Sequence, residues 1–189
     1  MRVSRPEFAA MVSGFEYVPQ FLSELEQREL LDAATAVPLA QAQYKQFTAK
    51  RRVAHFGGRY DFSNNELLEA SPIPEVLRPL RARVAAIARV APEDFTHAMI
   101  AEYQPGVQLG WHRDVPDFEL VAGVSLSSTA RLQFRPYPPT DIPRRHYFNA
   151  TLEPGSLYLL RGPARWEWQH RVPPVPALRY SITFRTLRR

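Results

Sequence analysis

Two stretches in the first half of the chain carry apolar residues at helical spacing, and each predicts a helix. The first begins after Phe21-Leu22-Ser23, where Ser23 and Glu26 have the spacing of a capping box, and it ends before Pro38. The second runs from about Glu75 to Arg89, and Pro79 is expected to trim or bend its first turn. The apolar positions of these two helices are Leu25, Leu30, Leu31 and Ala34, then Leu77, Leu80, Val84 and Ile87.

Between these helices, residues 51–62 alternate around a Gly57-Gly58 pair. Two glycines between strand-like segments are typical of a hairpin turn. We therefore expect a β-hairpin here.

From Phe95 onward the periodicity changes to that of short strands separated by proline-rich connectors. This pattern predicts a mainly β (α+β) protein, a double-stranded β-helix (jelly roll) with two N-terminal supporting helices and a β-hairpin lid. We expect a single domain over 1–189, with the helices and lid in 20–94 and the jelly-roll core in 95–189. The strand-like stretches lie near 99–103, 120–126, 132–134, 147–152, 156–160, 166–170 and 180–187.

The composition narrows the class of protein. There is no cysteine in 189 residues, which excludes disulfides and thiolate metal sites. The formal net charge of +5 is compatible with a polyanionic partner such as nucleic acid. No apolar run approaches a membrane span, and the N-terminus lacks the pattern of a signal peptide. A cytoplasmic monomer is the expectation.

The segment His112-Arg113-Asp114, followed at a distance by His170, carries the clearest chemical signal. Residues i and i+2 of a strand point to the same face, so His112 and Asp114 can converge on one ion. Two imidazoles and one carboxylate that leave coordination positions open form the ligand set of non-haem Fe(II) oxygenases. The pattern therefore predicts an iron site made by His112, Asp114 and His170.

Arg179 and Arg185 lie six residues apart in an alternating, β-branched and aromatic segment, so both point to one face of a strand. A guanidinium holds a carboxylate through two parallel hydrogen bonds. This arginine pair suits a dicarboxylic co-substrate beside the iron.

In these residues and their spacing, the chain resembles the AlkB family of Fe(II)- and 2-oxoglutarate-dependent dioxygenases over roughly residues 50–187. The run Tyr103-Gln104-Pro105-Gly106 before His112-Arg113-Asp114 is similar to the family's Tyr-x-x-Gly and His-x-Asp. The run from Arg179 to Arg185, Arg-Tyr-Ser-Ile-Thr-Phe-Arg, is similar to its double-arginine signature.

The resemblance implies a role for each matching residue. His112, Asp114 and His170 would hold Fe(II). Arg179, aided by the Tyr103 hydroxyl, would bind the distal carboxylate of 2-oxoglutarate, and Arg185 would lie near the carboxylate that chelates iron. Where the family has two asparagines, this chain has Ala101 and Ser181, so polar contacts to the co-substrate are missing or replaced.

The segment 51–62 is similar to the nucleotide-recognition lid of some family members. Phe56, Tyr60 and Phe62 share strand parity and could form a wall over a flipped base. Each could equally pack beneath the lid. Lys50, Arg51 and Arg59 could contact phosphates. The position of a base-recognising carboxylate in some relatives is Pro116 here, with Asp117 beside it.

Three hypotheses follow. The first is a dioxygenase that uses Fe(II), 2-oxoglutarate and O2 to dealkylate N-alkylated bases in DNA or RNA, for repair or demethylation. The alternative is a hydroxylase of a modified tRNA base or of a protein side chain, with the same iron chemistry. The third is a non-catalytic jelly-roll binding module.

Overall fold

The computed structural model describes residues 12–44, 47–61, 64, 66–139 and 147–188. The described helices are α2 (Glu24–Ala36), α3 (Arg78–Ala88) and α4 (Gly162–Trp166), with 3-10 turns at Glu75–Leu77 and Pro92–Asp94. The strands are β1 (Phe15–Val18), β2 (Ala40–Tyr44), β3 (Phe47–Phe56), β4 (Arg59–Asp61), β5 (Glu66–Leu68), β6 (Phe95–Tyr103), β7 (Leu109–His112), β8 (Phe118–Leu126), β9 (Ala130–Pro136), β10 (Phe148–Leu152), β11 (Leu157–Leu160), β12 (Trp168–Val172) and β13 (Arg179–Leu187). Phe62 lies outside the described residues.

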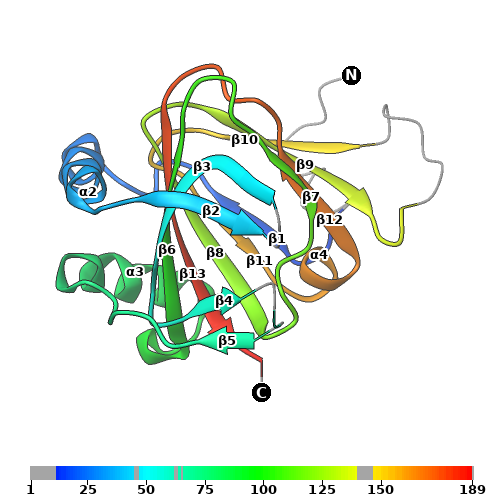
Figure 1. The fold of residues 1–189 in the computed structure, drawn as a ribbon, viewed down its shortest axis with the longest axis horizontal. Coiled ribbons are helices and arrows are strands. Elements are labelled where there is room, and N and C mark those ends of the chain that lie inside the picture. The colour runs from blue at the N-terminus through cyan, green and yellow to red at the C-terminus, as the bar shows by residue number, and fades with distance from the viewer. Residues whose placement is uncertain (1–11, 45–46, 62–63, 65, 140–146, 189) are drawn as a thin grey trace.

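Two sheets form the jelly roll that the sequence predicts (Figure 1). The major sheet has the order β1-β11-β8-β13-β6-β3-β2, and the minor sheet has the order β10-β9-β12-β7. Neighbouring strands in both sheets are antiparallel throughout the described ladders. The segment 15–56 adds β1, β2 and β3 to the major sheet, a contribution that the hydrophobic pattern did not reveal.

Both predicted helices are present, and they cover one face of the major sheet (Figure 1). Ser23 caps α2, and Glu26 completes the capping box. Pro79 lies in the first turn of α3, as its missing N–H group requires. The two helices pack against even-numbered residues of β13 such as Ile182 and Phe184, forming one of the two hydrophobic clusters. The second cluster fills the space between the two sheets.

The predicted hairpin over 51–62 is wrong in its strand pairing. β3 pairs with β2 on one side and with β6 on the other, and it does not pair with β4. β4 instead pairs with β5 in a separate two-stranded sheet. The turn itself is where it was expected: Gly57 has φ +76, and a Cβ there would lie 1.9 Å from the carbonyl oxygen of Thr96.

Among the residues that the structure describes, none of the helices has the length and apolar character needed to cross a bilayer.

Candidate metal and co-substrate site

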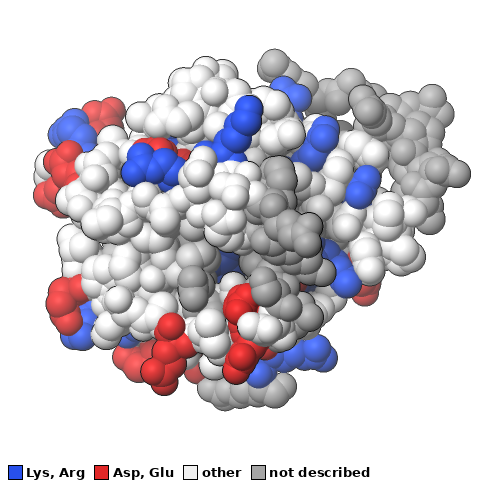
Figure 2. All heavy atoms as spheres, in the orientation of Figure 1, with Lys and Arg blue, Asp and Glu red and all other residues white. Residues whose placement is uncertain are grey.

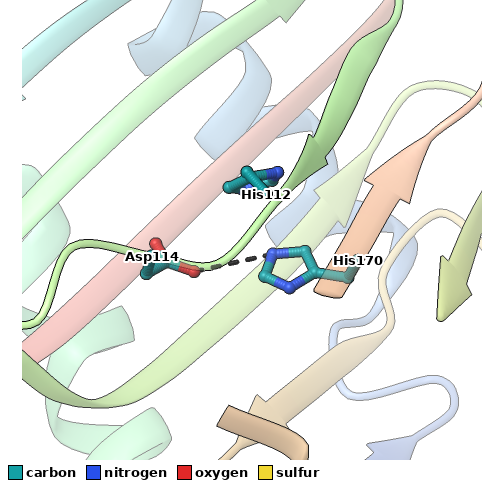
Figure 3. A group of neighbouring side chains, drawn as sticks. All are labelled: His112, Asp114 and His170. Carbon is teal, nitrogen blue, oxygen red and sulfur yellow. Dashed lines mark ion pairs between the residues drawn. The ribbon is translucent and has the colours of Figure 1, made fainter. Parts of the chain in front are cut away.

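Three side chains from β7, the following loop and β12 meet between the two sheets. His112 is the last residue of β7, Asp114 follows two residues later, and His170 pairs with His112 across the β7–β12 ladder. The ligand atoms of the three side chains all lie within 4.8 Å of one another. Figure 3 shows the three side chains turned toward one another, with Asp114 Oδ2 3.5 Å from His170 Nε2.

The protonation states suit a divalent metal. The backbone carbonyl of Gly110 lies 2.9 Å from His112 Nδ1, so this nitrogen donates its hydrogen there and Nε2 keeps a free lone pair. Burial, with the neighbouring His112, lowers the pKa of His170 to about 3, which keeps its imidazole neutral. Burial would raise the pKa of Asp114, but the neighbouring Arg185 guanidinium outweighs it and holds the pKa well below its usual range. Two neutral imidazoles and one carboxylate are the donor set that Fe(II) needs, so these residues fit that metal.

The loop that carries Asp114 is held in place by α4, a helix that the hydrophobic pattern did not predict. Arg165 of α4 is buried and donates hydrogen bonds from its guanidinium to the backbone carbonyls of Phe118, at 2.8 and 3.1 Å, and Val115, at 2.5 Å. Arg113 donates from the loop to the carbonyl of Trp166 at 2.8 Å. Asp114 lies beyond the end of β7, where no strand pairing fixes the backbone. These hydrogen bonds from Arg165 and Arg113 therefore orient the loop that carries Asp114.

Arg185 lies against Asp114, with Nε 3.0 Å from Oδ1. The resemblance placed Arg185 near the iron-chelating carboxylate of the co-substrate; in the structure it neutralises the protein's own carboxylate. Its Nη1 also lies 3.4 Å from His97 Nδ1 and 3.0 Å from Thr183 Oγ1. Because arginine has only donors, His97 Nδ1 must accept, and its hydrogen lies on Nε2, 3.3 Å from His55 Nδ1.

Arg179 is 2% exposed and lies opposite Tyr103 in the β13–β6 ladder. Its guanidinium carbon lies 5.2 Å from the centre of the Tyr103 ring, and its Nε donates to Ser125 Oγ at 3.2 Å. Ala101 and Ser181 face each other two pairs further along the same strands, so both departures from the family's asparagines lie on the same face as Arg179 and close to it. Two small side chains leave this part of the interior less polar than the family pattern implies.

Tyr158 is a site neighbour that the sequence did not indicate. It lies opposite Gly123, where an added Cβ would be 2.3 Å from the tyrosine ring, so glycine is required for this approach. Burial raises the pKa of Tyr158 to about 12, against the opposing charge of Arg179 and with the charge of Asp114 adding to the rise. Gly123 inside an apolar strand was the available signal, because such a glycine often marks close approach of another group. His97, Ser125 and Thr183 were missed for lack of any local motif.

The candidate lid aromatics that the structure describes lie on two different sheets, Phe56 on β3 and Tyr60 on β4. Phe56 is buried in the cluster beneath the helices and pairs with Ala98, on the face of β3 opposite to the iron ligands. The expected role of Phe56 over a base is therefore wrong, because strand alternation turns it away. Tyr60 remains half-buried near Asp117, whose charge adds to burial in raising the tyrosine pKa.

Arg51 is half-buried, and its charge adds to burial in lowering the pKa of His112. Its Nε is buried without a hydrogen-bond partner in the described part of the chain. The structure thus places Arg51, one of the candidate substrate contacts, toward the iron ligands.

The acid stability of the fold should depend on His97. Burial, aided by Arg185, lowers the pKa of His97 from 6.5 to about 2, so the folded protein leaves it neutral while the unfolded chain protonates it below pH 6.5. The free energy of unfolding should therefore fall as pH drops, by about 2 kcal/mol at pH 5 from this group. In His97→Phe and His97→Gln, the loss between pH 7.5 and pH 5 should be smaller by that amount, as measured by urea unfolding of metal-free protein. An unchanged loss in both variants would contradict the assignment.

Comparison with known proteins agrees with this geometry. The family model of the 2OG-Fe(II) oxygenase superfamily matches residues 14–185. The chain belongs to this superfamily. Its members use Fe(II), 2-oxoglutarate and O2, and His112, Asp114 and His170 could form the iron site.

Two AlkB-type proteins are among the sequence relatives to which this oxygenase is similar. It is 25% identical over 153 residues to the probable RNA/DNA demethylase ALKBH6 of Danio rerio, covering 77% of this chain and 63% of that protein. It is 25% identical over 183 residues to the alkylated DNA repair protein ALKBH8 homolog of Arabidopsis thaliana, covering 86% of this chain and 51% of that protein. The oxygenase thus spans about half to two thirds of the length of these two relatives.

Solved structures show the same fold. OsALKBH1 matches with a TM-score of 0.69 and 16% identity, covering 92% of this chain and 96% of its own. A prolyl-4-hydroxylase of Pseudomonas putida matches with a TM-score of 0.65 and 16% identity, covering 97% of this chain and 100% of its own. Both support the jelly-roll prediction.

Proposed function

We propose that this oxygenase oxidatively dealkylates N-alkylated bases in DNA or RNA. The observation that carries the proposal is the inward-facing group of His112, Asp114 and His170 beside the buried guanidinium of Arg179. Its similarity to a probable RNA/DNA demethylase and to an alkylated DNA repair protein favours a nucleic-acid substrate. The net charge of +5 is consistent with a polyanion.

In this proposal His112, Asp114 and His170 hold Fe(II), and Arg179 with Tyr103 holds the distal carboxylate of 2-oxoglutarate. Arg185 keeps Asp114 ionised and oriented through the 3.0 Å contact. When bound, Fe(II) with 2-oxoglutarate and O2 supplies the oxidation that turns a C–H bond into C–OH, releasing succinate and carbon dioxide. The protein's residues orient the substrate carbon and exclude water from the buried side of the site.

The N-alkyl group explains how hydroxylation becomes dealkylation. An N-methyl carbon that gains a hydroxyl is a hemiaminal, whose C–N bond breaks so that the base keeps the electron pair and formaldehyde leaves. Of the candidate lid aromatics, Tyr60 is described and lies outside the helix-side core, and in this proposal it covers the base, with Asp117 next to it as a candidate contact to the base edge. Arg51 would meet an anionic part of the substrate, since its Nε has no partner within the described chain.

A panel of N-methylated DNA and RNA oligonucleotides tests the proposal. With Fe(II), ascorbate and 2-oxoglutarate, we expect formaldehyde and succinate in equal amounts from at least one oligonucleotide, and a mass loss of one methylene in the product. Tyr60→Ala should lower this turnover about tenfold or more, the stacking contribution of one aromatic ring to one base. Tyr17→Ala is a matched control for the loss of a tyrosine ring, because half-buried Tyr17 lies on β1, at the edge of the major sheet opposite to β2.

Two outcomes would redirect the assignment. Succinate formation with a stable hydroxylated product, and no formaldehyde, would identify the hydroxylase of a tRNA base or a protein side chain. Absence of any Fe(II)-dependent succinate formation with every substrate would leave the non-catalytic module.

A further inference from the structure

The outer face of the minor sheet carries positive charge without any acidic residue on its outward positions. Strand β9 presents Arg131, Gln133 and Arg135 to this side, and β12 presents Gln169 and Arg171, while alternate residues of both strands are buried between the sheets. We name these five residues, together with Trp111 of β7, the arginine face.

The arginine side chains of this face are held in place by neutral partners. Arg135 donates its Nε to Gln169 Oε1 at 2.7 Å, and Arg171 donates its Nε to Gln133 Oε1 at 2.7 Å. Both guanidiniums lie over the indole of Trp111, at 4.6 and 4.8 Å from its ring centre. Cations fixed in this way are oriented without being neutralised.

Acidic partners are missing from the described surroundings of the arginine face. No ion pair within the described chain involves Arg131, Arg135 or Arg171. The outward positions of the neighbouring β10 are Asn149 and Thr151, which are exposed and uncharged. The acidic residues nearest along these strands are Glu153, just after the end of β10, and Glu167, just before the start of β12. In Figure 2, acidic side chains gather over the left and lower parts, and Lys and Arg prevail toward the upper right, where Figure 1 draws β7, β9 and β10.

We propose that the arginine face binds the sugar-phosphate backbone of single-stranded nucleic acid. Fixed, unpaired guanidiniums suit phosphate oxygens, because their planar donors form two parallel hydrogen bonds. Half-buried Trp111 keeps the two guanidiniums in place. The exposed Tyr137, just after β9, offers a ring surface on which an unpaired base can stack. Glutamine and asparagine amides add neutral hydrogen bonds. A membrane surface is a poorer match, since the outward positions supply no aliphatic side chain to enter lipid.

The arginine face lies directly behind the iron ligands, on the same strands. Trp111 and His112 are consecutive, as are His170 and Arg171, so the same strands direct one side chain to the metal and the next to the outer surface. β7 is the edge of the minor sheet, and a strand of nucleic acid bound outside can pass this edge toward the ligands. The choice of nucleic acid as the partner rests on the proposed function. The charge and geometry of the arginine face are independent of it.

Binding of unmodified single-stranded oligonucleotides, without iron or 2-oxoglutarate, tests the inference independently of turnover. Fluorescence anisotropy would compare the wild type with the triple variant R131Q/R135Q/R171Q. The control R28Q/R78Q/R89Q removes the same charge from exposed arginines on the helix side. We expect the dissociation constant to rise at least about tenfold in the first variant only. The slope of log Kd against log salt should fall by about 2, near 0.7 for each lost phosphate contact.

A single substitution provides a second test in case the triple variant does not fold. Arg131 is exposed and makes no hydrogen bond or ion pair within the described chain, so R131E should fold and weaken oligonucleotide binding about threefold or more. Equal affinities for wild type, both triple variants and R131E would overturn the inference. So would competition by polyglutamate as strong as that by an oligonucleotide of equal charge, because the face would then suit an acidic protein. Loss of formaldehyde release with binding intact would count against the proposed function alone.

Discussion

His112→Ala should abolish 2-oxoglutarate turnover, with a fall of at least about 1000-fold in succinate formation. The variant removes one of three metal ligands, and even changes to residues that merely orient such ligands typically cost about 10 to 100-fold. Anaerobic calorimetry, in which no turnover occurs, should show that the variant has also lost its affinity for Fe(II). The fold should survive, because His112 is only half-buried and its described hydrogen bond goes only to the carbonyl of Gly110.

Glu167→Gln is the matched control for this experiment. Its carboxylate lies three residues before His170, at the exposed end of α4, and should contribute nothing to the metal. Asp114→Asn is a less clean test, since it leaves the buried Arg185 without its counter-charge and should lower stability by about 3 to 5 kcal/mol. Wild-type iron affinity and turnover in His112→Ala would remove the basis for the assigned site.

Arg179→Met should raise the KM for 2-oxoglutarate by about 100-fold or more, and Arg179→Lys by nearly as much. Two charge-assisted hydrogen bonds to a carboxylate contribute about 1.5 to 3 kcal/mol each, and a lysine ammonium cannot reproduce the paired geometry. Arg179 is 2% exposed and already oriented by Ser125 and the Tyr103 ring, so its guanidinium is prepared for this contact. At saturating co-substrate, kcat should change less than KM.

A binding measurement separates this effect from general damage. In the presence of Fe(II), 2-oxoglutarate should raise the melting temperature of the wild type and of the exposed-arginine control Arg78→Lys, but not that of Arg179→Met. If 2-oxoglutarate stabilised all three proteins equally, the carboxylate anchor would have to be sought elsewhere in the chain.

Arg179 and Arg185 show which features of a site a sequence motif can predict. Their even spacing predicted a shared face, and both side chains do lie on the interior face of β13. Their partners differ, because Arg179 lies opposite Tyr103 whereas Arg185 lies beside the loop that carries Asp114. That difference depends on where β7 and its loop cross the end of β13, which no local pattern specifies.

Phe56 and His97 illustrate two further limits. Parity grouped Phe56 with Tyr60, but β3 and β4 belong to different sheets. Pairing of β3 with both β2 and β6 turns Phe56 toward the helices. His97 carried no motif, yet it connects His55 to Arg185 through contacts of 3.3 and 3.4 Å. Such contacts arise from residues distant in the chain.

The sequence by itself determined the helices with their cap, the change to strand periodicity near Phe95, and the residue types and spacing of the metal and arginine motifs. These features depend on neighbours within a few positions, where backbone geometry alone relates side chains. Only the tertiary structure decided the pairing of β3, the ion pair between Arg185 and Asp114, the clamp of α4 on the Asp114 loop, and the unpaired arginines outside the minor sheet. Those features depend on which strands lie side by side, and packing of the whole chain sets that arrangement.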